Sequence, residues 1–276
     1  MIAGCAMPAP RTAVPPDLRV MTFNVRTPSA DGVNVWANRR DLLVRTVRDA
    51  DPDVFGTQEL RKEQGDYVVA RLPAYAWFGE GRRGGDGDEH MGVFYRTDRL
   101  KVIESGNFWL SDTPDVPGSI SWGHPYPRMV TWALFERKAD GRRFYFLNTH
   151  LPYRDGDEPA RSKGAKAILA RLRALPKGMP IVLTGDFNTP PASEAHALLT
   201  GLLVDARSSA AERAGPDQTF HNFTGTPDRR IDWILTRGFT ALRAVTITVH
   251  EGAVYPSDHF PVLAVLRWNV SAAAAP

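Results

Sequence analysis

The stretch PIVLTGDFNTPP at residues 180–191 joins a short apolar run to a polar exit. The run at 181–183 predicts a strand covered on both faces, because a continuous apolar segment closed by Gly and Pro suits a buried strand. Asp186 and Asn188 follow two positions apart, so in extended backbone both side chains leave on the same side. A carboxylate and an amide that converge can orient or deprotonate a water, as phosphate ester hydrolysis requires. The alternative is a turn in which both side chains bond local backbone N–H groups.

The same pattern recurs elsewhere in the chain. Other apolar runs end in Asn24, in Glu59, in His150 and in the pair Asp258 and His259. Ordinary turns would scatter Ser, Lys and Thr at these exits, whereas acids, amides and imidazoles hold a hard divalent ion and a phosphate. We therefore expect these remote side chains to meet in one site.

Each of these groups also has a structural explanation when it is taken alone. The explanations are turn formation for Asn24 and Asn188, helix initiation for Glu59, core hydrogen bonding for His150, and burial beside Arg230 for Asp232. Their recurrence at the ends of separate runs favours the shared site.

The rest of the chain predicts an alternation of strands and helices. Strands are expected at 18–23, 53–57, 92–96, 102–109, 129–137, 144–149, 231–235 and 262–268. Helices are expected at 38–49, 63–72, 159–175 and 192–199. Residues 111–128 read as an ordered irregular loop and 205–229 as a polar loop. The Gly-rich segment 79–90 is interpreted as a flexible hairpin tip in preference to a loop that approaches an anionic ligand.

Composition bounds the organisation of the chain. Its 276 residues fit one large domain, which we place at 18–270, between a disordered lead at 1–17 and a flexible tail at 271–276. The formal charge of +3 implies no large positive field, which disfavours a general nucleic-acid coating protein. A single cysteine, Cys5, excludes an intrachain disulfide.

The first ten residues bear on localisation. Residues 2–5, Ile-Ala-Gly-Cys, resemble the cleavage box of bacterial lipoproteins, but the basic and apolar regions that should precede the box are missing. The alternatives are an exported lipoprotein attached through Cys5 and a chance tetrapeptide in a cytoplasmic protein. No apolar run is long enough to span a bilayer.

Six short motifs carry a resemblance to a known family. They are FNVR, GTQE, NTHL, GDFN, RIDWIL and SDHFP, in this order within residues 21–263. The chain thereby resembles the endonuclease/exonuclease/phosphatase superfamily of metal-dependent hydrolases. The segments GEGRRGG, FWLSDTP and PRMVTW resemble a bacterial, deadenylase-like branch of it. The resemblance implies an α/β fold, a four-layer α-β-β-α sandwich of two mixed sheets packed face to face with helices outside, whose strand ends meet in one cleft.

The resemblance also implies a metal site and catalytic roles. Glu59 would be the principal ligand of Mg²⁺ or Mn²⁺, helped by Asn24 and Asp258. The catalytic roles would fall to His150 on the scissile phosphate, Asp186 and Asn188 on the attacking water, and His259, bonded to Asp232, on the charge at phosphorus or as the base.

Two arginines are further candidates for binding the substrate phosphate. Arg26 stands where the abasic-site branch has an acid, which argues against a second metal ligand there and adds a phosphate contact. Arg128 begins a predicted strand and is either a phosphate ligand or a partner in a surface salt bridge.

The expected function is hydrolysis of phosphate esters by an activated water, in a monomer that depends on Mg²⁺ or Mn²⁺. One alternative is a nuclease, which needs a basic track with stacking aromatics. Trp109, Trp122, Tyr126 and Trp132 could supply such a platform or belong to the core, and residues 221–223 (His-Asn-Phe) are expected near the cleft. The other alternative is a non-catalytic module that binds phosphorylated ligands on the same fold. The modest net charge favours a compact substrate over nucleic acid.

Overall fold

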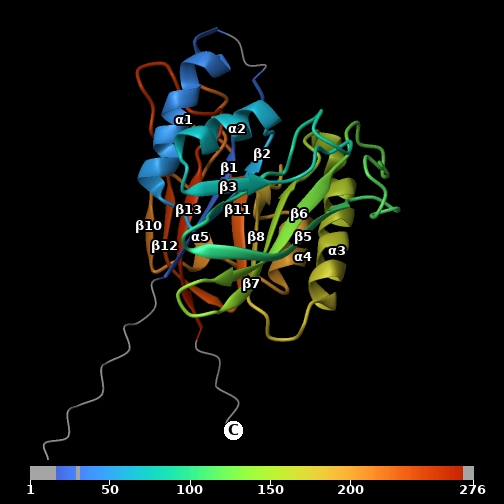
Figure 1. Ribbon diagram of the computed structural model, residues 1–276. Helices are drawn as coiled ribbons and strands as arrows, with labels where there is room; N and C mark the ends of the chain where they lie inside the picture. Colours follow the sequence, from blue (N-terminus) through green and yellow to red (C-terminus); the bar gives the residue numbers. More distant parts are fainter. Residues whose placement is uncertain (1–16, 29–31, 270–276) are drawn as a thin grey trace, which may run out of the picture.

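The computed structural model describes residues 17–28 and 32–269 as two β-sheets packed face to face, with helices on both outer faces (Figure 1). The expected four-layer α-β-β-α sandwich is confirmed. The predictions for Cys5, for the lead and for the tail concern residues outside those described. None of the described helices is long and apolar enough to cross a membrane.

The first sheet has seven strands among the described residues. In spatial order they are β10 (Glu212–Ala214), β12 (Phe239–Thr246), β13 (Val262–Trp268), β1 (Leu18–Asn24), β2 (Val54–Gln58), β4 (Val93–Arg96) and β3 (Tyr75–Phe78). The second sheet has six: β5 (Leu100–Trp109), β6 (Met129–Arg137), β7 (Arg143–His150), β8 (Ile181–Asp186), β11 (Asp232–Arg237) and β9 (Val204–Asp205).

The helices of the described chain all lie between these strands in sequence. They are η1 (Gly32–Asn34), α1 (Trp36–Ala50), α2 (Lys62–Arg71), η2 (Asp155–Asp157), α3 (Glu158–Ala174), α4 (Glu194–Thr200) and α5 (Ala206–Ser209). Helix α3 has Pro159 in its first turn, where proline's fixed φ suits a helix start, and it buries Ile168, Leu169 and Leu172 along one face.

Three hydrophobic clusters correspond to the three interfaces between four layers. The inter-sheet cluster contains residues from both sheets, among them Val54, Phe135 and Phe146. A second cluster joins α3 and α4 to the second sheet, and a third joins α1 and α2 to the first. Burial of both faces explains why β8 and β11 read as nearly continuous apolar runs.

Strand direction brings the polar strand ends to one edge. Strand β1 is parallel to β2 in the first sheet, and β7 is parallel to β8 in the second. Asn24 at the end of β1 hydrogen-bonds to Asp186 at the end of β8, so all four strands end on the same side. Strand β11 is antiparallel to β8 and therefore begins there, with Asp232 opposite Asp186. His150 is opposite Asp186 from the other neighbouring strand. The register thus aligns three of the predicted site residues across adjacent strands.

Two parts of the chain differ from the sequence prediction. Residues 205–229 are not a simple polar loop, because their start holds α5, β10 and the end of β9, elements too short to show a periodicity. Residues 79–90 are not a flexible hairpin tip. Arg82 and His90 are buried there, and Trp109 Nε1 donates to the Arg82 carbonyl over 2.7 Å, so this segment is fixed against the second sheet.

Candidate active site

Tight turns follow the strands that carry the site residues. Asn24 Oδ1 accepts from the backbone N–H of Arg26 over 3.0 Å, and Asp186 Oδ1 accepts from that of Asn188 over 2.9 Å. Arg26 and Asn188 both have left-handed backbone, with φ of 54° and 52°. The extended backbone expected after Asp186 is therefore wrong, because the side chain itself closes a turn. Asp186 therefore closes a local turn and also lies among the other predicted site residues.

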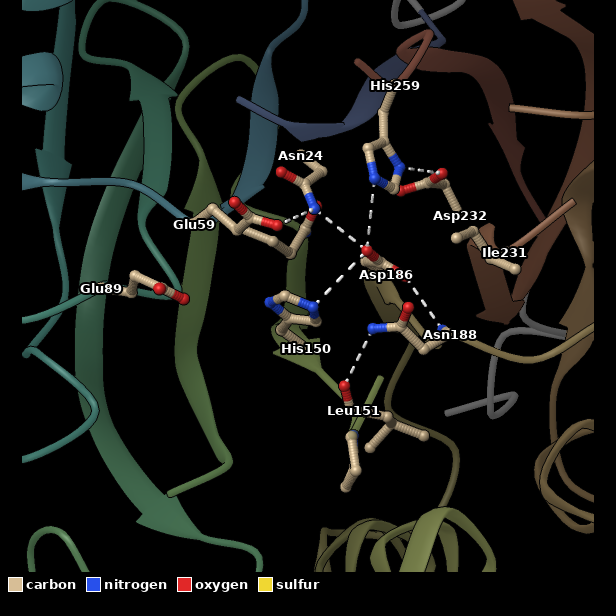
Figure 2. Close-up of polar contacts among 12 residues, drawn as sticks. Asn24, Glu59, Glu89, His150, Leu151, Asp186, Asn188, Ile231, Asp232 and His259 are labelled. Atoms are coloured by element: carbon tan, nitrogen blue, oxygen red, sulfur yellow. Dashed lines mark hydrogen bonds and ion pairs between the residues drawn. The ribbon is translucent and has the colours of Figure 1, made fainter. Parts of the chain in front are cut away.

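One carboxylate oxygen of Asp186 is the focus of the site (Figure 2). Its Oδ2 lies 3.0 Å from Asn24 Nδ2, 3.5 Å from His150 Nε2 and 3.8 Å from His259 Nε2. Asn188 extends its amide to the Leu151 carbonyl, 3.0 Å away. Burial, together with the negative charge of Asp232, raises the pKa of Asp186 to about 7.

His259 and Asp232 form a hydrogen-bonded pair behind Asp186. The distance from His259 Nδ1 to Asp232 Oδ2 is 2.9 Å, and the Thr219 hydroxyl donates to the same oxygen over 2.5 Å. Burial opposes a charge on His259, but the carboxylates of Asp232 and Asp186 outweigh it and raise the pKa of His259 to about 10. Arg230, the alternative partner for Asp232, instead binds Asp205 at 2.7 Å.

A second group of oxygens surrounds the guanidinium of Arg26. Its NH1 lies 3.4 Å from Glu59 Oε2, and its Nε lies 3.6 Å from Asp258 Oδ2. Asn24 Nδ2 links this group to Asp186, since it also donates to Glu59 Oε1 over 3.2 Å. The carboxylates of Glu59, Asp186 and Asp258 thus lie in one connected network. The oxygens of Glu59 and Asp258 in it contact the positively charged guanidinium of Arg26.

The buried guanidinium of Arg39 fixes the loop that carries Arg26. It donates to the carbonyls of Val25, Arg26 and Thr27, at 2.7, 2.7 and 3.0 Å, and to that of Pro256 at 2.9 Å. Burial lowers its pKa to about 10, which leaves it charged at neutral pH. Arg39 thereby ties the exit of β1 to the segment before Asp258, although its helical position gave no sign of this role.

Many of these groups line one pocket of about 410 Å³. The lining side chains are those of Arg26, Thr27, Glu59, Arg82, Glu89, Tyr126, Arg128, His150, Tyr153, Asp186, Asn188, Phe220, Asn222, Arg229, Ile231, Asp258 and His259. Arg128 NH1 and His150 Nδ1 are buried and have no hydrogen-bond partner among the described residues. Buried polar atoms without partners are costly, so these two nitrogens are available to bind a ligand or water in the pocket.

Arg128 and His150 have contrasting charges. Arg128 is buried in the pocket wall, so the surface salt bridge considered for it is wrong. Burial and the nearby charge of Arg82 lower its pKa to about 10, and the group stays cationic at neutral pH. Burial and the charge of Arg128 hold the pKa of His150 well below its ordinary value, which leaves its ring neutral.

The aromatic platform considered for nucleic acid does not form as a unit. Trp109 is buried against Met91 and Met129, Trp132 packs against Tyr145, and only Tyr126 of the four lines the pocket. Of residues 221–223, Asn222 reaches the pocket, while the His221 ring is buried against Phe260.

Sequence reasoning missed several pocket residues, namely Arg82, Glu89, Tyr153, Phe220 and Arg229. Arg82 and Glu89 belong to the charged, Gly-rich segment 79–90. That composition is the one sequence signal that could have indicated these two residues.

Two groups of residues could hold a metal ion. Asp186, Asp232 and His259 offer ligand atoms within 4.8 Å of one another. In that group His259 Nδ1 is already engaged by Asp232, and Asp232 does not line the pocket. Glu59 and Asp258 do line it, and their carboxylate oxygens suit a hard ion that keeps several waters. Asn24 is adjacent, but it turns its amide nitrogen toward Glu59, while its oxygen accepts from the Arg26 backbone N–H.

A face-to-face pair of sheets with acids, amides and imidazoles at their common edge is characteristic of sandwich-fold phosphoester hydrolases. The chain belongs to the endonuclease/exonuclease/phosphatase family, whose model matches residues 21–259. The predicted family is thus confirmed.

Solved structures agree with this assignment. A family member from Bacteroides vulgatus is 34% identical with a TM-score of 0.87, and the match covers 92% of this chain and 99% of that chain. A mannosyl-6-phosphatase from Bacteroides thetaiotaomicron is 33% identical with a TM-score of 0.85, covering 91% of this chain and 100% of that one. The catalytic domain of human Nocturnin, at 22% identity and a TM-score of 0.75, shares the fold over 92% of this chain and 95% of its own.

Curated relatives are matched over part of their length. Uncharacterized protein L388 of Acanthamoeba polyphaga mimivirus is 31% identical over 167 residues, which span 56% of this chain and 59% of the relative. The chain also spans half the length of Protein angel of Drosophila melanogaster, at 28% identity over 193 residues and 63% of this chain.

Proposed function

We propose that this protein hydrolyses phosphate monoesters of small hydroxylated compounds, by in-line attack of an activated water with the help of a divalent ion. The observation that carries the proposal is that the buried Asp186 carboxylate lines the same pocket as two buried nitrogens without hydrogen-bond partners among the described residues, Arg128 NH1 and His150 Nδ1. The likeness to a mannosyl-6-phosphatase over nearly the whole chain supports a monoester as substrate.

Glu59, Asn24 and Asp258 would hold the ion, which we take to be Mg²⁺ with Mn²⁺ as a substitute. When bound, such an ion supplies positive charge that offsets the charge developing on the leaving oxygen. The site suits a cation because the Arg26 guanidinium already contacts oxygens of both Glu59 and Asp258.

The remaining chemistry belongs to side chains around the phosphate. Asp186 would take a proton from the attacking water, which its pKa of about 7 allows near neutral pH, and Asn188 would orient that water. Arg128 and the neutral ring of His150 would donate hydrogen bonds to phosphoryl oxygens. The His259 imidazolium, held in place by Asp232, would stabilise negative charge in the transition state.

A nuclease is less well supported. Nocturnin shares only the fold at its level of identity, and of the four aromatics predicted as a stacking platform only Tyr126 lines the pocket. A non-catalytic binding module is also less well supported, because the raised pKa of Asp186 is typical of a catalytic acid or base.

The proposal is tested by measuring phosphate release from hexose 6-phosphates and from p-nitrophenyl phosphate, with magnesium, with manganese and with a chelator. We expect turnover of monoesters that the chelator abolishes and added metal restores. Cleavage of single-stranded DNA or RNA without monoester turnover would instead establish the nuclease.

A further inference from the structure

The pocket continues beyond the residues that we assign to the phosphate. Figure 2 shows Glu89 on the far side of Glu59 and His150 from Asp186. Arg82 pairs with Glu89, Tyr126 lies against Arg82, and Tyr153 lies near Tyr126, and all four residues line the pocket. Attack from the Asp186 side drives the leaving oxygen toward the opposite side, so the leaving alcohol would lie against this wall.

Arg82 and Glu89 form an ion pair fixed by backbone contacts. Arg82 NH1 lies 2.8 Å from Glu89 Oε2, and the Arg82 N–H donates to the Glu89 carbonyl over 2.8 Å. Arg82 Nε also lies 3.3 Å from Asp88 Oδ2. Within the described chain, Glu89 Oε1 and Arg82 NH2 make no hydrogen bond. The pair therefore presents one free acceptor and one free donor, in a rigid arrangement, beside the pocket.

Two tyrosines form an aromatic rim next to this pair. One face of Tyr126 is covered by the Arg82 guanidinium, whose carbon lies 4.5 Å from the ring centroid. The Tyr153 ring lies near Tyr126, with centroids 6.3 Å apart and an angle of 27° between planes. Arg82 thus covers one face of Tyr126, and both tyrosines stay partly exposed at the rim of the pocket.

We propose that Arg82 and Glu89 form a specificity subsite that binds neighbouring hydroxyl groups of the leaving alcohol, so that the substrate is a phosphorylated sugar. A carboxylate oxygen accepts from one hydroxyl while the adjacent guanidinium donates to the oxygen of the next, which matches a vicinal diol. Phosphate esters whose leaving alcohol carries no further hydroxyl group would bind through the phosphate alone. This inference rests on the proposed function.

The test compares the binding of hexose 6-phosphates with that of inorganic phosphate, in a variant that should not hydrolyse the sugar phosphates. In an Asp186→Asn background with magnesium, titration calorimetry measures the affinity for the 6-phosphates of mannose, glucose and galactose and for inorganic phosphate. Adding Glu89→Gln, which keeps the side-chain shape, should weaken binding of the preferred hexose phosphate about tenfold to a hundredfold, the worth of one hydrogen bond to a charged group. Binding of inorganic phosphate should change about twofold or less.

Glu80→Gln is the matched control, because Glu80 belongs to the same hairpin but does not line the pocket. It should leave every affinity unchanged. The subsite is overturned if no hexose phosphate binds better than inorganic phosphate, or if Glu89→Gln weakens all ligands equally or none. If hexose phosphates bind with this selectivity while the unmutated enzyme releases no phosphate from them, the subsite stands and the proposed function fails.

Discussion

The imidazole Nδ1 of His259 lies 2.9 Å from the carboxylate of Asp232, and both residues are buried behind Asp186. Without that carboxylate, burial would favour the neutral ring, so the pair keeps a positive charge beside Asp186, where we propose that the phosphate reacts.

Replacing the carboxylate tests this role. Asp232→Asn should lower kcat about a hundredfold to ten-thousandfold, because an aligned charged group in the transition state is lost. The alkaline limb of the pH–rate profile should also move to lower pH, since His259 then loses its proton more easily. An unchanged alkaline limb in the variant would show that His259 does not act as a cation.

The free energy of unfolding should reveal the positive charge of His259 without any measurement of catalysis. The pKa of His259 is raised from 6.5 to about 10 in the folded protein, so its protonation stabilises the fold fully below pH 6.5 and the effect is lost as the pH rises through about 10. The free energy of unfolding of the unmodified protein, minus that of His259→Gln, should therefore fall between these pH values. Urea denaturation at several pH values measures the difference, and a constant difference would contradict the assignment.

Arg26 should compete with a divalent ion, because its guanidinium contacts both Glu59 and Asp258. Arg26→Ala should tighten binding of Mn²⁺ about twofold to tenfold, the scale of two partly exposed ion pairs. Titration calorimetry without substrate measures this. Arg48→Ala, at an exposed position on α1 where Arg48 pairs with Asp49, is the control and should have no effect. Weaker Mn²⁺ binding by Arg26→Ala would mean that Arg26 supports the ion instead.

The close approach of the two sheets beneath the site depends on Gly56. A Cβ at this position would lie 2.3 Å from Thr184 Oγ1 and 2.4 Å from Asn148 Oδ1. These groups belong to a buried polar cluster in which Gln58 also donates to Asn148 Oδ1, over 2.7 Å. Gly56→Ala should therefore destabilise the protein by about 1–3 kcal/mol through overpacking.

Gly87→Ala is the control for this substitution, because nothing lies within 4 Å of the Cβ it adds. Its effect on the urea midpoint should be small. Equal stability of the two variants would show that the sheets can separate to accept a methyl group at Gly56.

The fold could be predicted from the sequence largely because its long elements carry clear periodicity and its motifs resemble a known family. Strand β6 begins and ends where the apolar run of the sequence predicts. Strand β3 and the elements around β10 were missed, because two to four residues define no period and their pairing depends on distant strands.

The site was predictable where a residue directly follows a buried run. Asn24, His150 and Asp186 end their strands, so chain direction alone brings them to one edge. Arg82 and Glu89 could not be found this way, because their position depends on how a Gly-rich hairpin folds back onto the second sheet. The role of Arg39 depends on loop carbonyls that only the folded chain brings together.

The central claim is that Glu59 holds a divalent ion beside the ester that Asp186 helps to hydrolyse. The most direct measurement is magnesium-dependent phosphate release by Glu59→Ala, with Glu63→Ala on the exposed face of α2 as control and thermal unfolding as a check of folding. We expect Glu59→Ala to stay folded and to lose about a thousandfold or more in kcat/KM, while the control keeps full activity. Full turnover by folded Glu59→Ala, with the same dependence on magnesium, would contradict the claim.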